Sequence, residues 1–371
     1  MRAFLANTLL AACSCLVLLV ILEFVVFRFV FVASDLPELA AQSTPGPLRY
    51  KPNQTGNYRL RNEINARFKI NNNGWNSGLE EYQVVEERKN LVVVIGDSYV
   101  EALQVNASES FAELLYEKIS KETSGVYRFG LSGAPLSQYL YMLREIVPKY
   151  KPSIAIVNLV HNDFAESLLQ GSGTYGASFA RVAFDDDGSI GLTEPVLYQR
   201  SATAWIKKSA IFRYLWVRQQ IRPQKIKQLW NLAFQKRAPT VEHVANVNIA
   251  DLDRATQIEE MMDYIFGEFA ELRKNHGVEF LLVLDGNRSA IIDSVEMGSP
   301  YENKLDWLHT LVEKTASKKN LPLVDLTDTF RADYSIHRRE FSFENDGHWN
   351  SHAHGLVAEE LANEIATRWP R

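Results

Sequence analysis

A serine, a histidine and an aspartate stand in local sequences that suit nucleophilic catalysis. Ser98 follows an apolar run and completes a Gly-Asp-Ser turn, in which Gly96 permits the tight geometry that would expose the hydroxyl. A serine hydroxyl is a weak nucleophile until a base removes its proton. His348 lies near the other end of the chain, and Asp346 lies two residues before it, so both can project from one loop. We expect Asp346 to orient the His348 imidazole and to stabilise its charged form.

Two residues between these blocks could stabilise a developing oxyanion. A backbone N–H at Gly133 and the side-chain amide of Asn162 could do so together with the N–H of Ser98. Each also has a plainer interpretation, because Gly133 could be only a tight turn and Asn162 only an Asx-turn or a helix cap. Asp163 is a weaker candidate than Asp346 for the orienting acid.

Strands and helices alternate around these residues. Apolar or β-branched runs predict strands at residues 91–95, 126–129, 154–159, 278–284 and 321–324. Helical periodicity follows the strands, for example at Phe111, Leu114, Leu115 and Ile119. This alternation predicts an α/β fold whose parallel sheet is covered on both faces. In such sheets ligands bind at the carboxyl ends of the strands, where Ser98, Gly133 and Asn162 are expected.

These blocks, in this order, resemble the SGNH (GDSL-like) hydrolase superfamily. Its pattern is a serine in Gly-Asp-Ser, a glycine after strand two, an asparagine in Gly-x-Asn-Asp and a C-terminal Asp/His pair. The resemblance covers about residues 91–165 and 255–371. It implies Ser98 as nucleophile, His348 as base, Asp346 as orienter, and Gly133 and Asn162 as oxyanion donors. It also implies a three-layer α/β/α fold with a five-stranded parallel sheet of flavodoxin-like order, and no cofactor.

Two positions depart from the family pattern. Val160 stands where a glycine is usual, which puts the presentation of Asn162 in question. The usual Asp-x-x-His spacing would put the acid at Asn345, whereas Asp346 gives Asp-x-His-Trp. That variant looks like the one in alginate O-acetyltransferases and related polysaccharide acetyl-transfer proteins. It therefore keeps acyl transfer open beside hydrolysis.

The N-terminus predicts a membrane anchor at residues 1–33. The stretch Phe4–Leu22 carries no charge, and about 20 apolar residues cross a bilayer as a helix. Arg2 favours a cytoplasmic N-terminus, which would place the rest of the chain on the extracytoplasmic (periplasmic) side. Two alternatives remain, a lipoprotein cleavage site before Cys13 and a cleaved secretory signal. In both, the rest of the chain is still exported, and only the anchor differs.

The remaining chain is predicted to divide into a membrane-proximal connector at 34–90 and a hydrolase domain at 91–371, with a helical basic insertion at about 165–250. No acidic residue lies between Glu194 and Glu242, and aromatic residues are interleaved with the basic ones. An apolar stripe at residues 226–234 fits a helix. The insertion either packs this stripe on the core and solvates its charges or lies on anionic lipid or polysaccharide.

Composition limits the other function classes. The net charge of −5 gives no basic field for nucleic acid. The two cysteines, Cys13 and Cys15, both lie in the apolar run, which excludes a disulfide framework.

Two further histidines follow His348. We expect His352 and His354 to be surface residues rather than metal ligands. They lie at the start of the last helix, which Asn350 or Ser351 would cap.

Three functions therefore compete. The first is a serine-dependent hydrolase of an acyl ester of a lipid or a carbohydrate. The second is an O-acyltransferase of an exported polysaccharide that uses the same acyl-enzyme. The third is a module without catalysis that binds glycan or lipid through the basic aromatic insertion. The sequence does not identify the acyl group or the alcohol.

Overall fold

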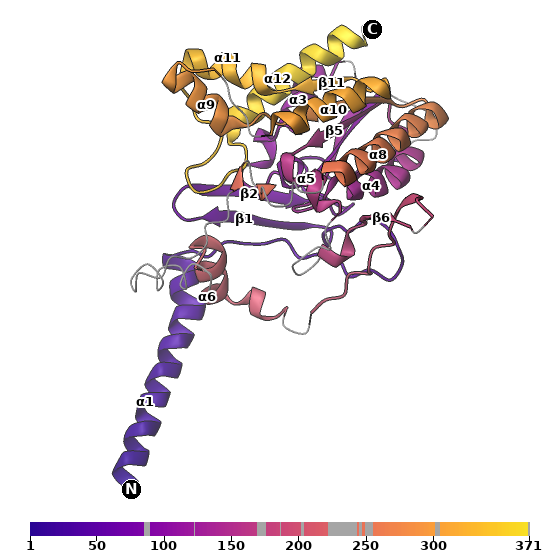
Figure 1. The fold of residues 1–371 in the computed structure, drawn as a ribbon. Coiled ribbons are helices and arrows are strands. Elements are labelled where there is room, and N and C mark those ends of the chain that lie inside the picture. The colour runs from indigo at the N-terminus through magenta and orange to yellow at the C-terminus, as the bar shows by residue number, and fades with distance from the viewer. Residues whose placement is uncertain are drawn as a thin grey trace. The chain divides into compact units, whose positions relative to one another are not determined.

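The computed structural model describes residues 1–84, 90–121, 123–168, 176–185, 187–201, 204–221, 243–244, 247–248, 255–300 and 305–369 (Figure 1). The chain divides into two compact units. The smaller one contains Met1–Leu36, Gly56–Ala66 and Arg200–Thr240, and the larger one contains Pro37–Thr55, Arg67–Gln199 and Val241–Arg371. Whether the segments bounded at residues 33 and 90 fold as separate parts stays a prediction.

The larger unit contains a five-stranded sheet in which all neighbouring strands are parallel. The strands are β3 (Leu91–Gly96), β4 (Gly125–Gly130), β5 (Ile154–Leu159), β10 (Glu279–Leu284) and β11 (Leu323–Asp325). Their order across the sheet is β11-β10-β5-β3-β4, so β3 lies inside the sheet between the two strands that follow it in the chain. This is the flavodoxin-like order, and the five predicted strands are confirmed.

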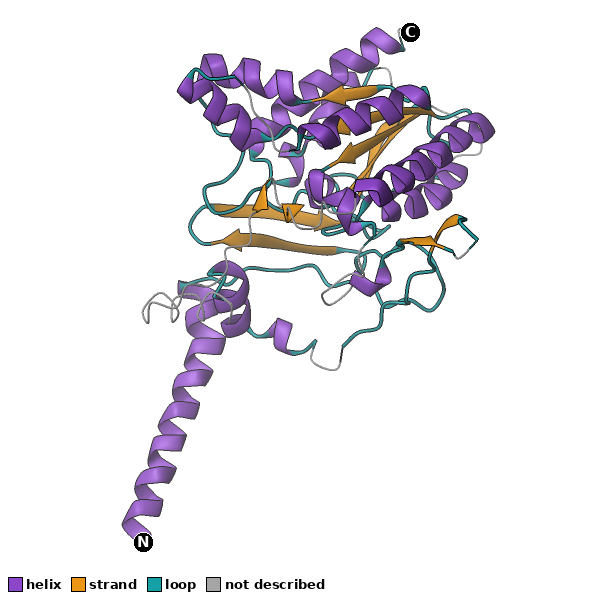
Figure 2. Ribbon diagram, in the orientation of Figure 1, coloured by secondary structure: helices purple, strands orange, loops and turns teal. Residues whose placement is uncertain are grey.

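Helices cover both faces of the sheet, which confirms the three-layer α/β/α prediction (Figure 2). One layer consists of α3 (Phe111–Ile119), α9 (Arg288–Met297), α11 (Thr327–His337) and α12 (Ser351–Arg368). The other consists of α4 (Leu136–Tyr150), α8 (Ala255–His276) and α10 (Asp306–Lys318). Because both faces are buried, the strands are continuously apolar rather than alternating.

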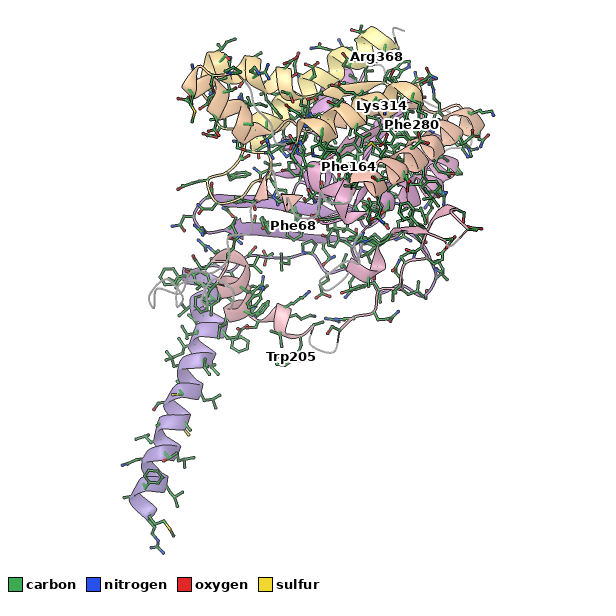
Figure 3. The ribbon with its side chains drawn as sticks, viewed as in Figure 1. Phe68, Phe164, Trp205, Phe280, Lys314 and Arg368 are labelled. Carbon is green, nitrogen blue, oxygen red and sulfur yellow. The ribbon has the colours of Figure 1, made fainter. Side chains whose placement is uncertain are left out.

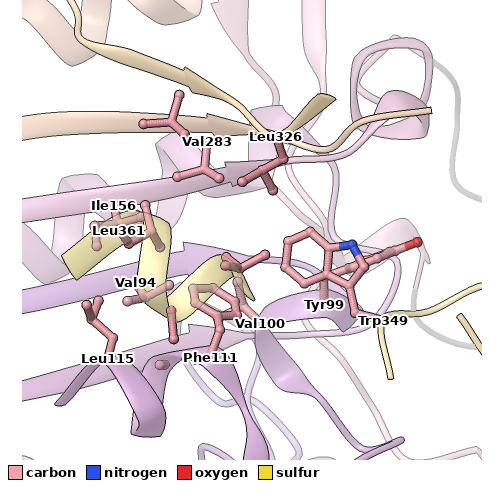
Figure 4. Packing of buried hydrophobic residues seen from close by; sticks show 14 of the residues in the cluster. Val94, Tyr99, Val100, Phe111, Leu115, Ile156, Val283, Leu326, Trp349 and Leu361 are labelled. Atoms are coloured by element: carbon pink, nitrogen blue, oxygen red, sulfur yellow. The ribbon is translucent and has the colours of Figure 1, made fainter. Parts of the chain in front are cut away.

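The core under α3 and α12 fixes the strand ends that carry the site (Figure 4). Val94, Ile156 and Val283, from three neighbouring strands, are fully buried there. Leu115 of α3 and Leu361 of α12 pack against the same cluster and are also fully buried. Each such side chain contributes about 1.5–3 kcal/mol of burial free energy, so this packing stabilises the strands that lead to the site.

Several described elements were not predicted. Residues within the predicted connector form the antiparallel hairpin of β1 (Gln54–Leu60) and β2 (Ile64–Ile70), and the helices α9 and α11 were also missed. In the larger unit Trp75 of the predicted connector packs edge-on against Phe129, with ring centroids 5.3 Å apart. The segment at 67–84 is therefore part of the folded core and more than a spacer.

The insertion is not wholly helical, which corrects the sequence prediction. The hairpin of β6 (Val182–Phe184) and β7 (Ile190–Leu192) lies within it, turning at Gly188 with φ +83°. A glycine in the left-handed region closes a hairpin readily, and this turn signal was overlooked. The predicted stripe at 226–234 lies outside the described residues.

The N-terminal helix consists of α1 (Arg2–Ile21), continued without a break by the π-helical segment η1 (Leu22–Val30). Together they make a 29-residue helix that is long and apolar enough to cross a membrane. Every residue of α1 is exposed, and Leu22, Glu23, Val26 and Phe27 of η1 are partly buried. A signal sequence would have the same properties, so the membrane anchor and its orientation stay predictions.

Candidate active site

Ser98 lies at the carboxyl end of the inner strand β3, as the first residue of the short helix α2 (Ser98–Glu101). Asp97 caps this helix, because its carboxylate accepts the N–H of Tyr99 at 2.9 Å. The Ser98 side chain is mostly enclosed, with 8% of the residue exposed. The strand, the cap and the helix together hold the hydroxyl at the edge of the sheet, where the parallel fold places ligands.

The loop before α12 brings His348 and Asp346 to Ser98. The Ser98 Oγ lies 2.7 Å from His348 Nε2, and His348 Nδ1 lies 2.5 Å from Asp346 Oδ1. Asp346 Oδ1 also accepts the backbone N–H of His348 at 3.0 Å, which fixes the carboxylate. A carboxylate can only accept, so His348 Nδ1 carries the proton and Nε2 is free to receive the Ser98 hydroxyl proton. The three predicted residues therefore form one hydrogen-bonded chain.

The electrostatics of this chain suit a general base. Burial alone would lower the pKa of His348, but the hydrogen bond and the charge of Asp346 outweigh it and raise that pKa above its usual value. Burial would raise the pKa of Asp346, but the hydrogen bond and charge of His348 outweigh it and lower that pKa. The pair therefore favours an ionised Asp346 beside an imidazole that readily takes a proton.

A second layer of polar contacts supports the loop, and the sequence prediction missed it. Tyr99 donates its hydroxyl to the carbonyl of Gly347 at 3.0 Å, and Arg288 donates to the Tyr99 oxygen at 2.6 Å. Asp285 lies 3.2 Å from Arg288 and accepts the indole N–H of Trp349 at 3.0 Å. Asp285 directly follows β10, so inspection of every strand end, not only the first three, would have found it.

Gly133 and Asn162 follow the two strands that flank β3. Gly96 pairs with Gly130 and Ile95 pairs with Val157, so the ends of β4 and β5 reach the same edge as Ser98. Gly133 has φ +74°, which a glycine adopts without strain, and a Cβ there would meet nothing within 4 Å. This backbone is therefore open to a neighbouring group. The roles of Gly133 and Asn162 as oxyanion donors stay proposals.

The departure at Val160 is accommodated by ordinary backbone geometry. Val160 precedes α5 (His161–Glu166) with φ −116° and ψ 152°, a conformation open to any residue. Asn162 lies in the first turn of α5 and is partly buried. The glycine that is usual in the SGNH pattern is therefore not required for this turn.

A buried carboxyl group holds the loop that contains Gly133. Glu101, at the end of α2, is 1% exposed and accepts the hydroxyls of Tyr50 and Ser132. Burial raises the pKa of Glu101, and the hydrogen bonds from Ser132 and Tyr50 act against that rise. Because Ser132 precedes Gly133, Glu101 links the helix of the candidate nucleophile to the loop of a candidate oxyanion donor.

A chain of two imidazoles and a carboxylate anchors the start of α5. His161 Nε2 lies 2.8 Å from His309 Nε2, and His309 Nδ1 lies 2.8 Å from Asp325 Oδ2. Burial, with the charges of His309 and Arg288, lowers the pKa of His161 to about 3. His161 is therefore neutral near pH 7, and the chain ties the first turn of α5 to the end of β11.

Of the two acids that the sequence offers, Asp346 is the one hydrogen-bonded to His348, whereas Asp163 has other partners. Asp163 is fully buried, and its carboxylate accepts the N–H of Val160 at 2.7 Å at the start of α5. Burial and the charge of Asp97 raise the pKa of Asp163 well above its usual value. Asp163 is thus a cap within α5.

The prediction that His354 is a surface residue was wrong. His354 is 1% exposed, and its Nδ1 accepts the backbone N–H of Phe111 at 3.2 Å.

The other residues at the start of α12 have ordinary structural partners. His352 Nε2 forms a hydrogen bond with Asp333 at 2.7 Å. Asn350 caps α12 by accepting the N–H of Ala353, as predicted. Within the described ranges, no group of three or more histidine, cysteine or acidic side chains is arranged to hold a metal ion.

No protein-family model matches the chain, and no curated protein matches it. Solved structures that match include an acetyl xylan esterase, AlAXEase, at 12% identity and a TM-score of 0.39, over 74% of this chain and 99% of that one. TesA matches at 12% identity and a TM-score of 0.39, over 75% and 98%. An SGNH hydrolase described as putative, from Slackia heliotrinireducens, matches at 11% and 0.35, over 74% and 98%. At such identities and TM-scores, these likenesses carry no argument about the reaction of this chain.

Proposed function

We propose that this chain is a serine-dependent ester hydrolase of the SGNH type. The observation that carries the proposal is the hydrogen-bonded chain from Ser98 Oγ through both nitrogens of His348 to Asp346. Nucleophile, base and orienter within hydrogen-bond reach are the arrangement that activates a serine for acyl transfer. The flavodoxin-like strand order and the position of Ser98 at a strand end support the same assignment.

In the first half of the reaction Ser98 Oγ attacks the ester carbonyl while His348 Nε2 takes the hydroxyl proton. The carbonyl oxygen becomes an oxyanion, which the N–H groups of Ser98 and Gly133 and the amide of Asn162 stabilise. The C–O bond of the ester then breaks, and His348 returns the proton to the departing alcohol. In the second half, water attacks the acyl-enzyme, His348 takes a proton from it, and the acid leaves as Ser98 recovers its proton.

Acyl transfer to a sugar hydroxyl is the second candidate. It uses the same acyl-enzyme, and an alcohol replaces water in the second half. The observation that favours it is the Asp-x-His-Trp spacing of Asp346, His348 and Trp349. The Trp349 side chain is fully buried, and its indole N–H donates a hydrogen bond to Asp285. This spacing resembles that of the polysaccharide acetyl-transfer proteins.

The first experiment measures hydrolysis of p-nitrophenyl acetate and longer-chain esters by the full chain in detergent. Ser98→Ala and His348→Ala are compared with Ser335→Ala and His276→Ala, which make the same changes at exposed positions. Loss of a triad member costs roughly 10⁴-fold or more in kcat, whereas the exposed variants should keep the wild-type rate. If all four variants keep that rate, Ser98 and His348 are not catalytic.

A fluorophosphonate label separates the remaining outcomes when no ester is turned over. Labelling that Ser98→Ala abolishes, combined with transfer to an added acceptor sugar, would assign acyl transfer. A folded protein that is never labelled at Ser98 would instead be a glycan- or lipid-binding module.

We also propose that the chain is anchored in the cell membrane as a single-pass protein. The length and apolar composition of the helix Arg2–Val30 support this anchor, and Arg2 favours a cytoplasmic N-terminus. The acyl-ester substrate would then be met on the extracytoplasmic side.

A further inference from the structure

The smaller unit contains a short helical segment packed along the N-terminal helix. This segment, which we call the collar, begins at Trp205 and contains η4 (Ile206–Lys208), α6 (Ala210–Phe212) and η5 (Arg213–Arg218). Figure 1 shows α6 beside the upper end of the N-terminal helix, and α6 contacts η1 directly. The collar belongs to the same compact unit as the helix.

Glu23 is the residue that joins the collar to the helix. It is the acidic residue that interrupts the apolar run, and its carboxylate accepts three hydrogen bonds from the start of α6. The donors are the Ser209 hydroxyl at 2.8 Å and the N–H groups of Ala210 at 2.8 Å and Ile211 at 3.1 Å. Glu23 is therefore an internal helix cap, which accounts for an acidic residue in an apolar helix.

The collar runs in the same direction as the helix, away from the N-terminus. Tyr214 stacks on Phe27, with ring centroids 4.4 Å apart, one turn beyond the contact at Glu23. Arg218 donates to the carbonyl of Val32 further along. The start of α6 is thus the part of the collar held at Glu23, and η4 directly precedes it in the chain.

If α1 crosses the bilayer core, its length places the start of the collar at the membrane surface. A bilayer core of about 30 Å takes about 20 helical residues, and α1 has 20, from Arg2 to Ile21. If α1 spans the core, Glu23 emerges at the boundary with the headgroups. The segment before α6 then lies at the same level, because Glu23 holds the start of α6.

The side chains at that level suit a headgroup region. Trp205 is 69% exposed, and Figure 3 shows it lower in the view than α6. Lys207 and Lys208 are exposed beside it. Exposed tryptophan next to lysine is typical of membrane–water interfaces, where the indole lies among headgroups and the ammonium groups meet lipid phosphates.

We propose that the collar is a membrane-interface element, in which Trp205 inserts among the lipid headgroups and Lys207 and Lys208 bind anionic phospholipid. The occupant of this surface is the bilayer that α1 crosses, because the collar is bonded to the helix at the level where that helix leaves the membrane. The proposal rests on the proposed membrane anchor and is independent of the reaction at Ser98.

The test measures quenching of tryptophan fluorescence by brominated lipid. The full chain is reconstituted in phosphatidylcholine vesicles that contain phosphatidylglycerol, with and without bromine on the acyl chains. Trp205→Phe should remove a measurable part of the quenched emission. Trp307→Phe, the same change on α10 of the larger unit, should leave the quenched emission unchanged. Equal quenching in wild type and Trp205→Phe would overturn the insertion of Trp205.

The lysine contacts are tested in the same vesicles. Quenching of wild type should rise with the phosphatidylglycerol fraction and fall with salt, and the variant K207Q/K208Q should lose this dependence. The control variant Lys121→Gln/Lys274→Gln removes two exposed charges from the larger unit. It should keep the wild-type dependence of quenching on phosphatidylglycerol and salt. An unchanged lipid dependence in K207Q/K208Q would overturn the lysine contact.

The same fluorescence also distinguishes lipid from saccharide. If the emission of Trp205 changes with a soluble anionic polysaccharide but not with lipid, the surface binds a saccharide and the proposal is overturned.

Discussion

Asp346 and Asp333 form a natural matched pair, because each accepts a histidine ring N–H in this structure. Asp346 lies 2.5 Å from His348, and Asp333 lies 2.7 Å from His352. Only the first pair adjoins Ser98. A catalytic role therefore predicts that the same substitution has very different effects at the two positions.

Asp346→Asn should lower kcat by on the order of 10³-fold or more, because the imidazole loses the group that fixes its tautomer. It should also move the acidic limb of kcat/KM. His348 acts as a base only when neutral, so the rate rises as pH increases through its pKa, which Asp346 raises. Without Asp346 the effect of burial remains, and the limb should shift to lower pH. The pH profile of ester turnover measures both effects.

Asp333→Asn should leave the rate and the position of that limb unchanged. If both variants retain wild-type kinetics, Asp346 does not orient the base, and the Ser98–His348 contact is structural.

His354 provides a pH-dependent stability prediction. Burial lowers the pKa of His354 to about 3, and of His161 to about 3, whereas an unfolded histidine titrates near 6.5. Between these values the unfolded chain binds protons that the folded chain does not, so stability is fully present above pH 6.5 and falls as pH decreases. Each histidine contributes a slope of at most about 1.4 kcal/mol per pH unit.

His354→Asn should reduce this loss, because an amide oxygen can still accept the N–H of Phe111 but does not titrate. Urea unfolding of the protein in detergent at pH 7 and pH 4.5 measures the free energy of unfolding at both values. His276→Asn, an exposed change, should leave the difference between the two pH values as it is in wild type. The same difference in His354→Asn as in wild type would show that folding does not lower the pKa of His354.

At the scale of elements, the close approach of α2 and β4 determines where Ser98 lies. A Cβ at Gly130 would lie 2.1 Å from the backbone nitrogen of Glu101 and 2.5 Å from the carbonyl carbon of Val100. These are backbone atoms of the helix that begins at Ser98, so they cannot move aside independently of the candidate nucleophile.

Gly130→Ala should therefore destabilise the protein by about 2 kcal/mol or more and lower kcat, since α2 must shift. Gly355→Ala is the matched control, because Gly355 lies inside α12 and a Cβ there would meet nothing within 4 Å. That variant should gain about 0.5–1 kcal/mol from helix propensity. Unfolding midpoints and ester turnover of the two variants measure the contrast. Equal stability of the two variants would contradict the close packing of α2 on β4.

The five sheet strands were predictable because a strand buried on both faces is apolar at every position. The hairpin β1–β2 was not predicted, although Ile64, Ala66, Phe68 and Ile70 alternate with more exposed residues. Its turn places Arg61 at φ +46°, where glycine or asparagine is usual, so the local turn signal is weak. Helix α11 was missed because only Phe330 and Tyr334 of its residues are buried.

The site was predictable to a similar extent and for a similar reason. Ser98, Asp346 and His348 have local sequence signals, and the structure brings them together. The contacts of Arg288 and Glu101 depend on tertiary packing between segments far apart in the chain, which a local pattern does not encode. His354 was mistaken for a surface residue for the same reason, because its partner Phe111 is 243 positions away.

At the scale of the whole molecule, the proposed orientation puts Arg2 in the cytoplasm and the larger unit outside. The chain itself allows a clean test, because its two cysteines, Cys13 and Cys15, both lie within α1. Replacing both with alanine gives a cysteine-free background into which single cysteines can be placed. Lys274→Cys, at the exposed end of α8, reports on the larger unit, and Ala3→Cys reports on the N-terminus.

A membrane-impermeant maleimide applied to spheroplasts should label Lys274→Cys at once and Ala3→Cys only after the membrane is permeabilised. The single basic residue Arg2 and the uncharged stretch that follows it favour this orientation. The reverse pattern would place Ser98 in the cytoplasm and exclude exported polysaccharide as its acyl acceptor. Immediate labelling of both positions would mean that α1 does not separate them, in which case Trp205 would have no bilayer at the level of Glu23 and the collar would need another partner.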